Sequence, residues 1–265
     1  MAIQDFSDTS LTELISLKNR SAVVTGGARG IGLAIAKRLA EAGANILIAD
    51  IDVGGCLDKA IAEIRELGAK AEGISFDTRN AKSMEKAAAA AARHFGKLDI
   101  WINDAGIYPE SALLEIEDKM LDEVIDTNFK GVIYGSRAAA KQMLKNGGVI
   151  LNLSSVAGFK GTSDMAHYNA TKYAVRGLTA SLAQEWGKYN IRVLAVAPTL
   201  IDTPGIYEQA KNIEKDKNKL LETISLGRIG LPDDIARVTT MLVSDVCAFM
   251  TGTTVVVDGG DMVLG

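Results

Sequence analysis

One junction constrains the fold of this 265-residue chain more than any other. An apolar run, Ala22–Thr25, passes directly into the glycine-rich turn Thr25-Gly-Gly-Ala-Arg-Gly-Ile-Gly32, and a helical pattern follows at once. In such a turn Gly26 permits a tight bend, Gly30 lets a phosphate approach the backbone, and Gly32 permits close packing of the helix on the strand. The backbone N–H groups that open the helix attract negative charge. The junction therefore predicts a parallel sheet with a diphosphate site at its edge.

The rest of the chain repeats this alternation of short apolar runs and longer helical patterns. Strands that are apolar throughout are typical of a parallel sheet covered on both faces. The predicted strands are Ala22–Thr25, Asn45–Ala49, Ala71–Ser75, Ile100–Asn103, Val149–Leu153, Arg192–Ala197 and Thr254–Val257. The predicted helices are Gly32–Gly43, Asp58–Gly68, Lys82–Gly96, Glu117–Asn146, Ala166–Tyr189 and Asp233–Ser244. The pattern predicts a doubly wound α/β fold of about seven parallel strands with helices on both faces.

The spacing of these elements is steady and contains no linker or internal repeat, so residues 17–265 are expected to form a single domain. An N-terminal arm, residues 1–16, precedes it and contains the capping-box sequence Ser10-Leu-Thr-Glu13. A lid-like insertion of about residues 199–227 follows a strand end and carries the charged stretch Lys211–Lys219. This stretch is interpreted either as a solvated helix face or as part of a lid over the site.

Charge and composition exclude several classes of partner. The 29 basic and 33 acidic residues give a net charge of −4, so nothing attracts the chain globally to nucleic acid or anionic lipid. No apolar run reaches the ~18 residues that a membrane span needs. Two cysteines and two histidines are too few for a disulfide framework or a metal cluster. We expect a cytoplasmic protein that binds no metal, nucleic acid or membrane.

A carboxylate stands where the second strand ends. Asp50 closes the run Asn45-Ile-Leu-Ile-Ala-Asp50, about 20 residues after the glycine turn, where an acidic residue can accept hydrogen bonds from both ribose hydroxyls of an adenosine. The same charge would repel a 2′-phosphate, so NAD is favoured over NADP. Arg29 opposes this preference, because a guanidinium in the turn could neutralise a phosphate. The alternative for Asp50 is a turn residue that caps the next helix.

Tyr168 and Lys172 lie one turn apart in a predicted helix and therefore share a face. A free phenol has a pKa of ~10, and an ammonium group ~4 Å away could lower it by ~3 units at an effective dielectric constant of ~20. A positively charged oxidised nicotinamide would act in the same direction. Ser155 ends a strand thirteen residues before Tyr168 and could bind the same substrate oxygen. The pattern indicates acid–base chemistry at Tyr168.

These motifs together resemble the classical short-chain dehydrogenase/reductase family, from about Leu17 to Gly260. The glycine turn, Asn128 in Asn-Phe-Lys-Gly, Ser155 and Tyr168-x-x-x-Lys172 occur in the order and spacing of that family. The resemblance implies a Rossmann fold and a catalytic tetrad. In this tetrad Tyr168 transfers the proton, Ser155 orients the substrate oxygen, Lys172 binds the nicotinamide ribose and lowers the phenol pKa, and Asn128 positions a proton-relaying water.

The resemblance also implies a set of cofactor contacts. Asp77 would receive the adenine edge, and Pro198 and Thr203 would fix the nicotinamide. The full expected cofactor set is Gly26, Arg29, Gly30, Ile31, Gly32, Asp50, Ile51, Asp77, Thr78, Asn103, Ala105, Gly106, Tyr168, Lys172, Pro198, Thr199, Ile201 and Thr203. Two positions depart from the family pattern: Asp104 replaces the second Asn of Asn-Asn-Ala-Gly, and Thr199 replaces the common Gly after Pro198.

The expected activity is NAD-dependent hydride transfer between nicotinamide and a secondary alcohol or ketone, with a polyol, a sugar or a hydroxysteroid-like molecule as candidate substrates. One alternative is an NADP-linked 3-oxoacyl thioester reductase, against which Asp50 argues. Another is a dinucleotide-binding regulator without catalysis, against which the complete tetrad argues. The family also implies a homotetramer that packs through the helices around Glu117–Asn146 and Ala166–Tyr189.

Overall fold

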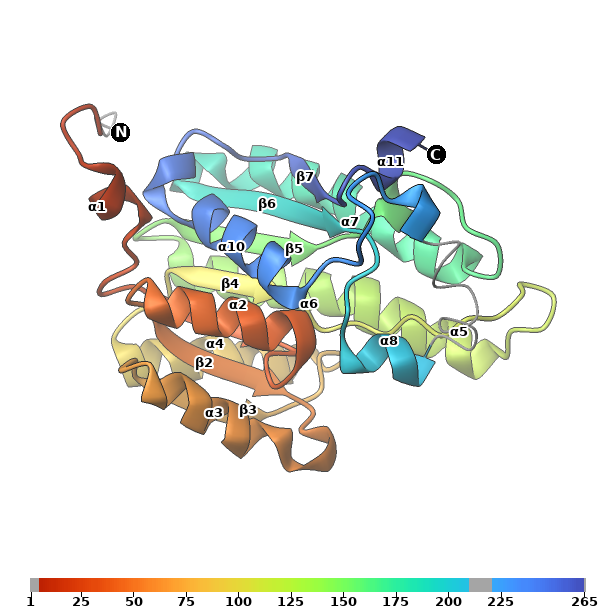
Figure 1. Cartoon of the computed structure of the whole chain (residues 1–265). Coiled ribbons are helices and arrows are strands. Elements are labelled where there is room, and N and C mark those ends of the chain that lie inside the picture. The colour runs from red at the N-terminus through yellow and green to blue at the C-terminus, as the bar shows by residue number, and fades with distance from the viewer. Residues whose placement is uncertain (1–4, 210–220, 265) are drawn as a thin grey trace.

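A computed structural model describes residues 5–209 and 221–264 and contains one seven-stranded sheet (Figure 1). The strands are β1 (Ser21–Thr25), β2 (Asn45–Asp50), β3 (Ala71–Ser75), β4 (Ile100–Asn103), β5 (Gly148–Leu153), β6 (Ile191–Pro198) and β7 (Thr254–Val257). They run parallel in the order β3-β2-β1-β4-β5-β6-β7. The predicted strands and the doubly wound α/β fold class are confirmed.

Helices cover both faces of the sheet. The described helices are α1 (Leu11–Ile15), α2 (Gly30–Glu41), α3 (Cys56–Glu66), α4 (Ala81–Phe95), α5 (Asp118–Ile125), α6 (Gly131–Met143), α7 (Ala166–Trp186), α8 (Pro204–Gln209), α10 (Pro232–Val243) and α11 (Asp261–Leu264). Short 3₁₀ turns lie at Val53–Gly55, Val156–Gly158, Gly187–Tyr189 and Asp245–Cys247. Buried residues of α2, α3 and α10 form one apolar core with the sheet, and those of α4, α6 and α7 form the other.

Alternation along the strands explains the two cores. Ala22 and Val24 of β1 face the α2 side, whereas Val23 between them faces the α4 side. All three side chains are fully buried. Successive residues of a strand point to opposite faces, so an apolar strand with no polar interruption contributes to both cores.

The predicted helix Glu117–Asn146 is divided in the structure. Its middle, Asp126–Lys130, is a five-residue π-helical segment between α5 and α6, and α6 ends at Met143. Side-chain periodicity does not reveal such a segment, because one extra residue per turn shifts the pattern only slightly. Asn128 lies in this segment.

The first helix forms as the capping-box sequence predicts. The Ser10 side chain accepts a hydrogen bond from Glu13 N, and the Glu13 carboxylate accepts one from Ser10 N. The boundary at residue 17 between arm and domain stays a prediction. In the lid-like insertion, α8 is described, but the charged stretch Lys211–Lys219 lies outside the described residues.

The sheet order reverses between β1 and β4. Ordinarily a ligand of such a fold binds at this point, beyond the carboxyl ends of the strands. Thr25 pairs with Asn103 here, and the strand arrows of Figure 1 point toward the side of the molecule where α5, α8 and α11 lie. Within the described residues, no helix is long and apolar enough to cross a membrane.

Candidate active site

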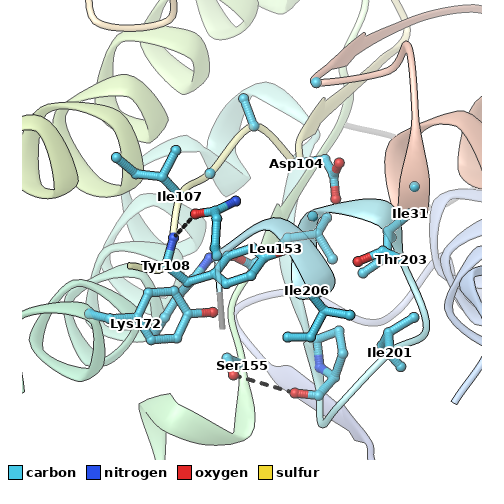
Figure 2. A pocket seen from close by; sticks show the side chains of 18 of the residues that line it. Ile31, Asp104, Ile107, Tyr108, Leu153, Ser155, Lys172, Ile201, Thr203 and Ile206 are labelled. Carbon is cyan, nitrogen blue, oxygen red and sulfur yellow. Dashed lines mark hydrogen bonds between the residues drawn. The ribbon is translucent and has the colours of Figure 1, made fainter. Parts of the chain in front are cut away.

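A cavity of about 840 Å³ opens at the carboxyl ends of the strands (Figure 2). Most of the predicted site residues line it. They are Gly26, Arg29, Gly30, Ile31, Asp50, Ile51, Asp77, Thr78, Ala105, Gly106, Ser155, Tyr168, Lys172, Pro198, Thr199, Ile201 and Thr203. Segments from the whole length of the chain are thus brought into one cleft.

The glycine turn has the geometry that its sequence predicts. Gly26 and Gly30 have φ angles of +68° and +58°, which side chains rarely tolerate. A Cβ atom on Gly26 would come within 2.9 Å of Ala105 Cα, and one on Gly32 would overlap the Gly26 carbonyl oxygen. A Cβ on Gly30 would meet only Thr203, at 3.5 Å. The turn is therefore tight where it packs and open where it faces the cavity.

The opening turn of α2 fits an anionic ligand. Arg29, the residue before this helix, makes no side-chain capping bond, and the first turn of the helix carries no acidic residue. Gly30 and Ile31 of this turn line the cavity, and free backbone N–H groups at a helix start attract a diphosphate. A nicotinamide adenine dinucleotide would be held here by the glycine turn and by the carboxylate at the end of β2.

Asp50 is held in place by backbone N–H groups. Its two carboxylate oxygens accept hydrogen bonds from Ala28 N at 3.0 Å and Asp52 N at 3.1 Å. Both bonds fix the carboxylate at the rim of the cavity, where each oxygen retains a further lone pair. Asp52 itself does not line the cavity; its carboxylate accepts a hydrogen bond from Leu57 N at the start of α3.

Arg29 forms an ion pair with a residue of the lid-like insertion. Its guanidinium lies 2.8 Å from both carboxylate oxygens of Glu208 in α8, a residue 179 positions away. Both side chains are about half exposed, so the pair contributes little to stability, although it sets where the guanidinium points. Sequence reasoning had no means of finding this partner.

Ser155, Tyr168 and Lys172 meet at the other end of the cavity. The Lys172 ammonium lies 5.5 Å from the centre of the Tyr168 ring and donates a hydrogen bond to Leu153 O at 2.7 Å. Ser155 Oγ contacts Pro198 O at 3.4 Å and accepts a hydrogen bond from Ala157 N. Figure 2 shows Ser155 and Lys172 among the cavity side chains. The helical spacing i, i+4 places the phenol and the amine on one face, as expected.

The expected acidification of Tyr168 is not found in the protein alone. Burial raises the pKa of the phenol to about 12, and a hydrogen bond with Ser155 opposes this only in part. Burial also lowers the pKa of the Lys172 amine to about 8. Desolvation therefore dominates the pKa of the phenol, and Lys172 is not among the groups that lower it. Tyr168 is protonated at neutral pH, the state needed to give a proton to a carbonyl oxygen.

Three predicted site residues do not line the cavity: Gly32, Asn103 and Asn128. Asn128 is buried, and its amide side chain holds the backbone of Ile107 through bonds of 2.9 Å to the N–H and 2.6 Å to the carbonyl. It therefore shapes the wall of the cavity from behind. Its expected part in positioning a water stays a prediction.

Asn103 faces the interior between the sheet and α6. Its side chain accepts a hydrogen bond from Trp101 Nε1 at 2.7 Å and donates to Asn152 Oδ1 at 2.8 Å and Ser136 Oγ at 3.0 Å. All these side chains are buried. A side chain with every polar atom engaged in this network is not available to a ligand in the cavity.

The wall of the cavity contains an ion pair that the sequence did not indicate. Lys160 Nζ lies 2.7 Å from Asp261 Oδ1, and Thr199 Oγ1 donates to Asp261 Oδ2 at 2.5 Å. Asp261 opens the C-terminal helix α11 and is buried. Thr199, one of the two departures from the family pattern, thus connects the lid-like insertion to the C-terminus.

Asp104, the other departure, lies in the wall of the cavity against the first turn of α2. Burial raises the pKa of its carboxyl group to about 7, although Lys172 and the Gly32 N–H act in the opposite direction. A neutral asparagine at this position would carry no such desolvation penalty.

We therefore expect Asp104→Asn to stabilise the protein above neutral pH. An unfolded aspartate has a pKa near 3.8, so the folded protein binds more protons between pH ~4 and ~7 and its stability falls as the pH rises through that range. The variant should gain little at pH 4 and about 2–4 kcal/mol of unfolding free energy at pH 8. Urea denaturation at both pH values measures this, and an equal gain at the two would contradict the shifted pKa.

The glycine turn lies where the order of the parallel sheet reverses, and a serine, a tyrosine and a lysine share its cleft. This combination of fold and site defines a nucleotide-dependent oxidoreductase. Residues 26–261 match the family model described as enoyl-(acyl carrier protein) reductase. The chain therefore belongs to the short-chain dehydrogenase/reductase family, whose members act on CH–OH groups with a nicotinamide dinucleotide.

Individual relatives have several activities. The chain is 38% identical to the 3-oxoacyl-(acyl-carrier-protein) reductase FabG of Staphylococcus epidermidis over 91% of this chain and 98% of the relative. It is 37% identical to the 3alpha-hydroxysteroid dehydrogenase of Mediterraneibacter gnavus over 92% and 97%. A structure from Agrobacterium tumefaciens, assigned as a 2-deoxy-D-gluconate 3-dehydrogenase with bound NADP, superposes with a TM-score of 0.86 at 32% identity, covering 94% of this chain and 99% of that one.

Proposed function

We propose that this protein is an NAD-dependent oxidoreductase that transfers a hydride between the nicotinamide and a secondary alcohol or ketone. The observation that carries the proposal is that Ser155, Tyr168 and Lys172 share one cavity with the glycine turn and Asp50. A dinucleotide held by its adenosine at Asp50 and its diphosphate at the turn would extend toward the serine, tyrosine and lysine. When bound, it supplies or accepts the hydride.

The protein groups at this end each have a distinct part in the proposed reaction. Tyr168 Oη gives its proton to the carbonyl oxygen in reduction and takes it back in oxidation. Ser155 Oγ orients the same oxygen by a hydrogen bond. Lys172 holds the nicotinamide ribose through its ammonium group, and Leu153 O fixes the direction of that amine. The Tyr108 ring packs edge-on against Tyr168 with its centre 6.2 Å away.

Two contacts support NAD rather than NADP. The anchored Asp50 carboxylate would repel a 2′-phosphate, and Arg29, the cation of the glycine turn, is paired with Glu208. A phosphate would have to displace this carboxylate before it could use the guanidinium. The Agrobacterium tumefaciens protein of the same fold has NADP bound, so the fold by itself does not favour NAD.

Asp50→Ala is expected to shift the cofactor preference toward NADP. The ratio of kcat/KM for NADH to that for NADPH should fall by about 10- to 100-fold, because one charge repulsion and a hydrogen-bonded ribose contact are lost. The matched control is Asp52→Asn, which removes a neighbouring charge that does not line the cavity. An unchanged ratio in Asp50→Ala, or an equal change in Asp52→Asn, would contradict the ribose assignment.

The substrate end favours an apolar ketone or secondary alcohol. Apolar side chains line much of this part of the cavity, among them Ile107, Tyr108, Met165, Leu200, Ile206 and Ile224. The nearby ammonium of Lys160 is already paired with Asp261. A hydroxysteroid-like molecule fits this lining better than a polyol or a sugar, whose hydroxyl groups would need polar partners.

The second candidate is an NADP-linked 3-oxoacyl thioester reductase, favoured by the similarity to FabG. One assay separates the two: oxidation of NADH and NADPH is followed with cyclic ketones, hydroxylated ketones and an acetoacetyl thioester. Turnover of cyclic ketones with NADH supports the proposal. A strong preference for NADPH and the thioester would establish the alternative, and absence of turnover with every carbonyl compound would favour a non-catalytic regulator.

We also propose that the protein is a cytoplasmic homotetramer in which α5, α6 and α7 pack against symmetry mates. The support is the family membership. Sedimentation velocity tests the subunit number, and a monomer at micromolar concentration would contradict it.

A further inference from the structure

Asp104 places a second anion beside the turn that is proposed to bind the diphosphate. A Cβ atom on Gly32 would lie 2.6 Å from Asp104 Oδ2, so the carboxylate packs directly on the first turn of α2. The Gly32 N–H donates a hydrogen bond to this carboxyl group. In Figure 2 Asp104 lies on the side of the cavity near Ile31 and Thr203. The carboxylate thus uses part of the positive end of the helix that a diphosphate would also use.

The groups around Asp104 do not neutralise it fully. Lys172 of α7 favours its ionised form, whereas Asp50 of β2 opposes it. The phenols of Tyr168 and Tyr108 also face it, and its charge acts on the pKa of both. Its backbone N–H is directed away, to Thr25 Oγ1 at 3.1 Å. The carboxyl group therefore lies in the cavity wall among one cation, one anion and two neutral hydroxyl groups.

Two negative groups at one helix terminus repel each other, and only one of them can lose its charge near neutral pH. The phosphodiester groups of a dinucleotide stay ionised, whereas burial raises the pKa of Asp104 to about 7. A protonated Asp104 still accepts the hydrogen bond from Gly32 and no longer repels the diphosphate. It then resembles asparagine, the usual residue of the family at this position.

We propose that Asp104 takes up a proton from solvent when a dinucleotide binds. Cofactor binding by this chain is then coupled to protonation of the Asp104 carboxyl group beside the glycine turn. The inference rests on the proposed function, because it requires the diphosphate to lie at the turn. One O–H bond forms at the carboxyl group, the donor is water or buffer, and no electrons move.

This coupling makes cofactor affinity depend on pH. Below about pH 6, Asp104 is protonated before binding and the dissociation constant is constant. Above about pH 7 the dissociation constant should rise by up to ~10-fold per pH unit, because each binding event must also bind a proton. In the Asp104→Asn variant the side chain at position 104 is uncharged at every pH. This variant should therefore bind the dinucleotide with a nearly constant dissociation constant.

Isothermal titration calorimetry tests the proposal directly. Binding of NADH and of ADP-ribose is measured at pH 7.5 in two buffers with different ionisation enthalpies, which gives the number of protons taken up. ADP-ribose is included because it carries the diphosphate without the nicotinamide and has no phosphate that titrates near neutrality. We expect uptake of roughly 0.5–0.8 proton per ligand for the wild type and close to none for Asp104→Asn.

The matched control is Glu123→Gln, which removes another carboxyl group of the same cavity. Glu123 has no part in the proposed cofactor site, so its loss should leave the proton uptake unchanged. Wild-type binding without proton uptake, or undiminished uptake in Asp104→Asn, would overturn the inference alone and leave the proposed function intact. Failure of the wild type to bind either ligand would overturn both.

Discussion

Tyr168→Phe is expected to lower kcat by about 10²–10⁴-fold while the dissociation constant for NADH changes by less than about threefold. The substitution removes one oxygen atom and keeps the ring that packs beside Tyr108 and Lys172. The phenol is the only proton donor in the proposed reaction, and its raised pKa keeps it protonated at neutral pH. Turnover should therefore fail at the proton transfer, not at cofactor binding.

Steady-state kinetics with an active ketone and fluorescence titration with NADH measure the two quantities separately. The matched control is Tyr108→Phe, which removes the hydroxyl of the other tyrosine in the same cavity. Because Tyr108 has no part in proton transfer in the proposed mechanism, its variant should keep kcat within about tenfold. A Tyr168→Phe enzyme with wild-type kcat would remove this residue from the mechanism.

Asn103→Ala should lower the free energy of unfolding by about 3–5 kcal/mol and leave the dissociation constant for the dinucleotide nearly unchanged. The truncation leaves Trp101 Nε1 and Asn152 Oδ1 without their partners in the protein interior. Each buried polar group without a partner costs about 1–3 kcal/mol, and the missing side chain adds a small cavity.

Urea denaturation gives the change in stability, and Asn152→Ala serves as the control because it removes the neighbouring member of the network far from any ligand contact. The double variant should lose less than the sum of the single losses, because the two side chains are direct partners. If Asn103→Ala instead weakens cofactor binding tenfold at unchanged stability, the side chain contacts the ligand.

Asn103 illustrates what a motif can and cannot predict. The resemblance placed it in a stretch that lines the cofactor, and its neighbours Ala105 and Gly106 do line the cavity. Successive residues at a strand end point in opposite directions, so the main chain can border a ligand while one side chain faces the core. The direction of that side chain follows from its partners Ser136 and Asn152, 33 and 49 residues away.

Local patterns were enough to predict the features that depend on few neighbouring residues. The junction at Thr25–Gly32 implies its own tight turn, since glycine adopts the positive φ angles of Gly26 and Gly30 without strain. The place of Asp50 at the cavity follows from its position at the end of β2. The shared face of Tyr168 and Lys172 follows from helical geometry. A local sequence determines local geometry because backbone conformation and side-chain periodicity involve only the nearest residues.

The amino-acid sequence alone thus determined the succession of strands and helices along the chain, the place of the glycine turn and the residues with acid–base chemistry. The tertiary structure decided how these residues behave. Burial keeps Tyr168 protonated and raises the pKa of Asp104, and ion pairs form between Arg29 and Glu208 and between Lys160 and Asp261. The physical reason is that desolvation and long-range pairing depend on which distant segments pack together, and periodicity along the chain carries no record of that.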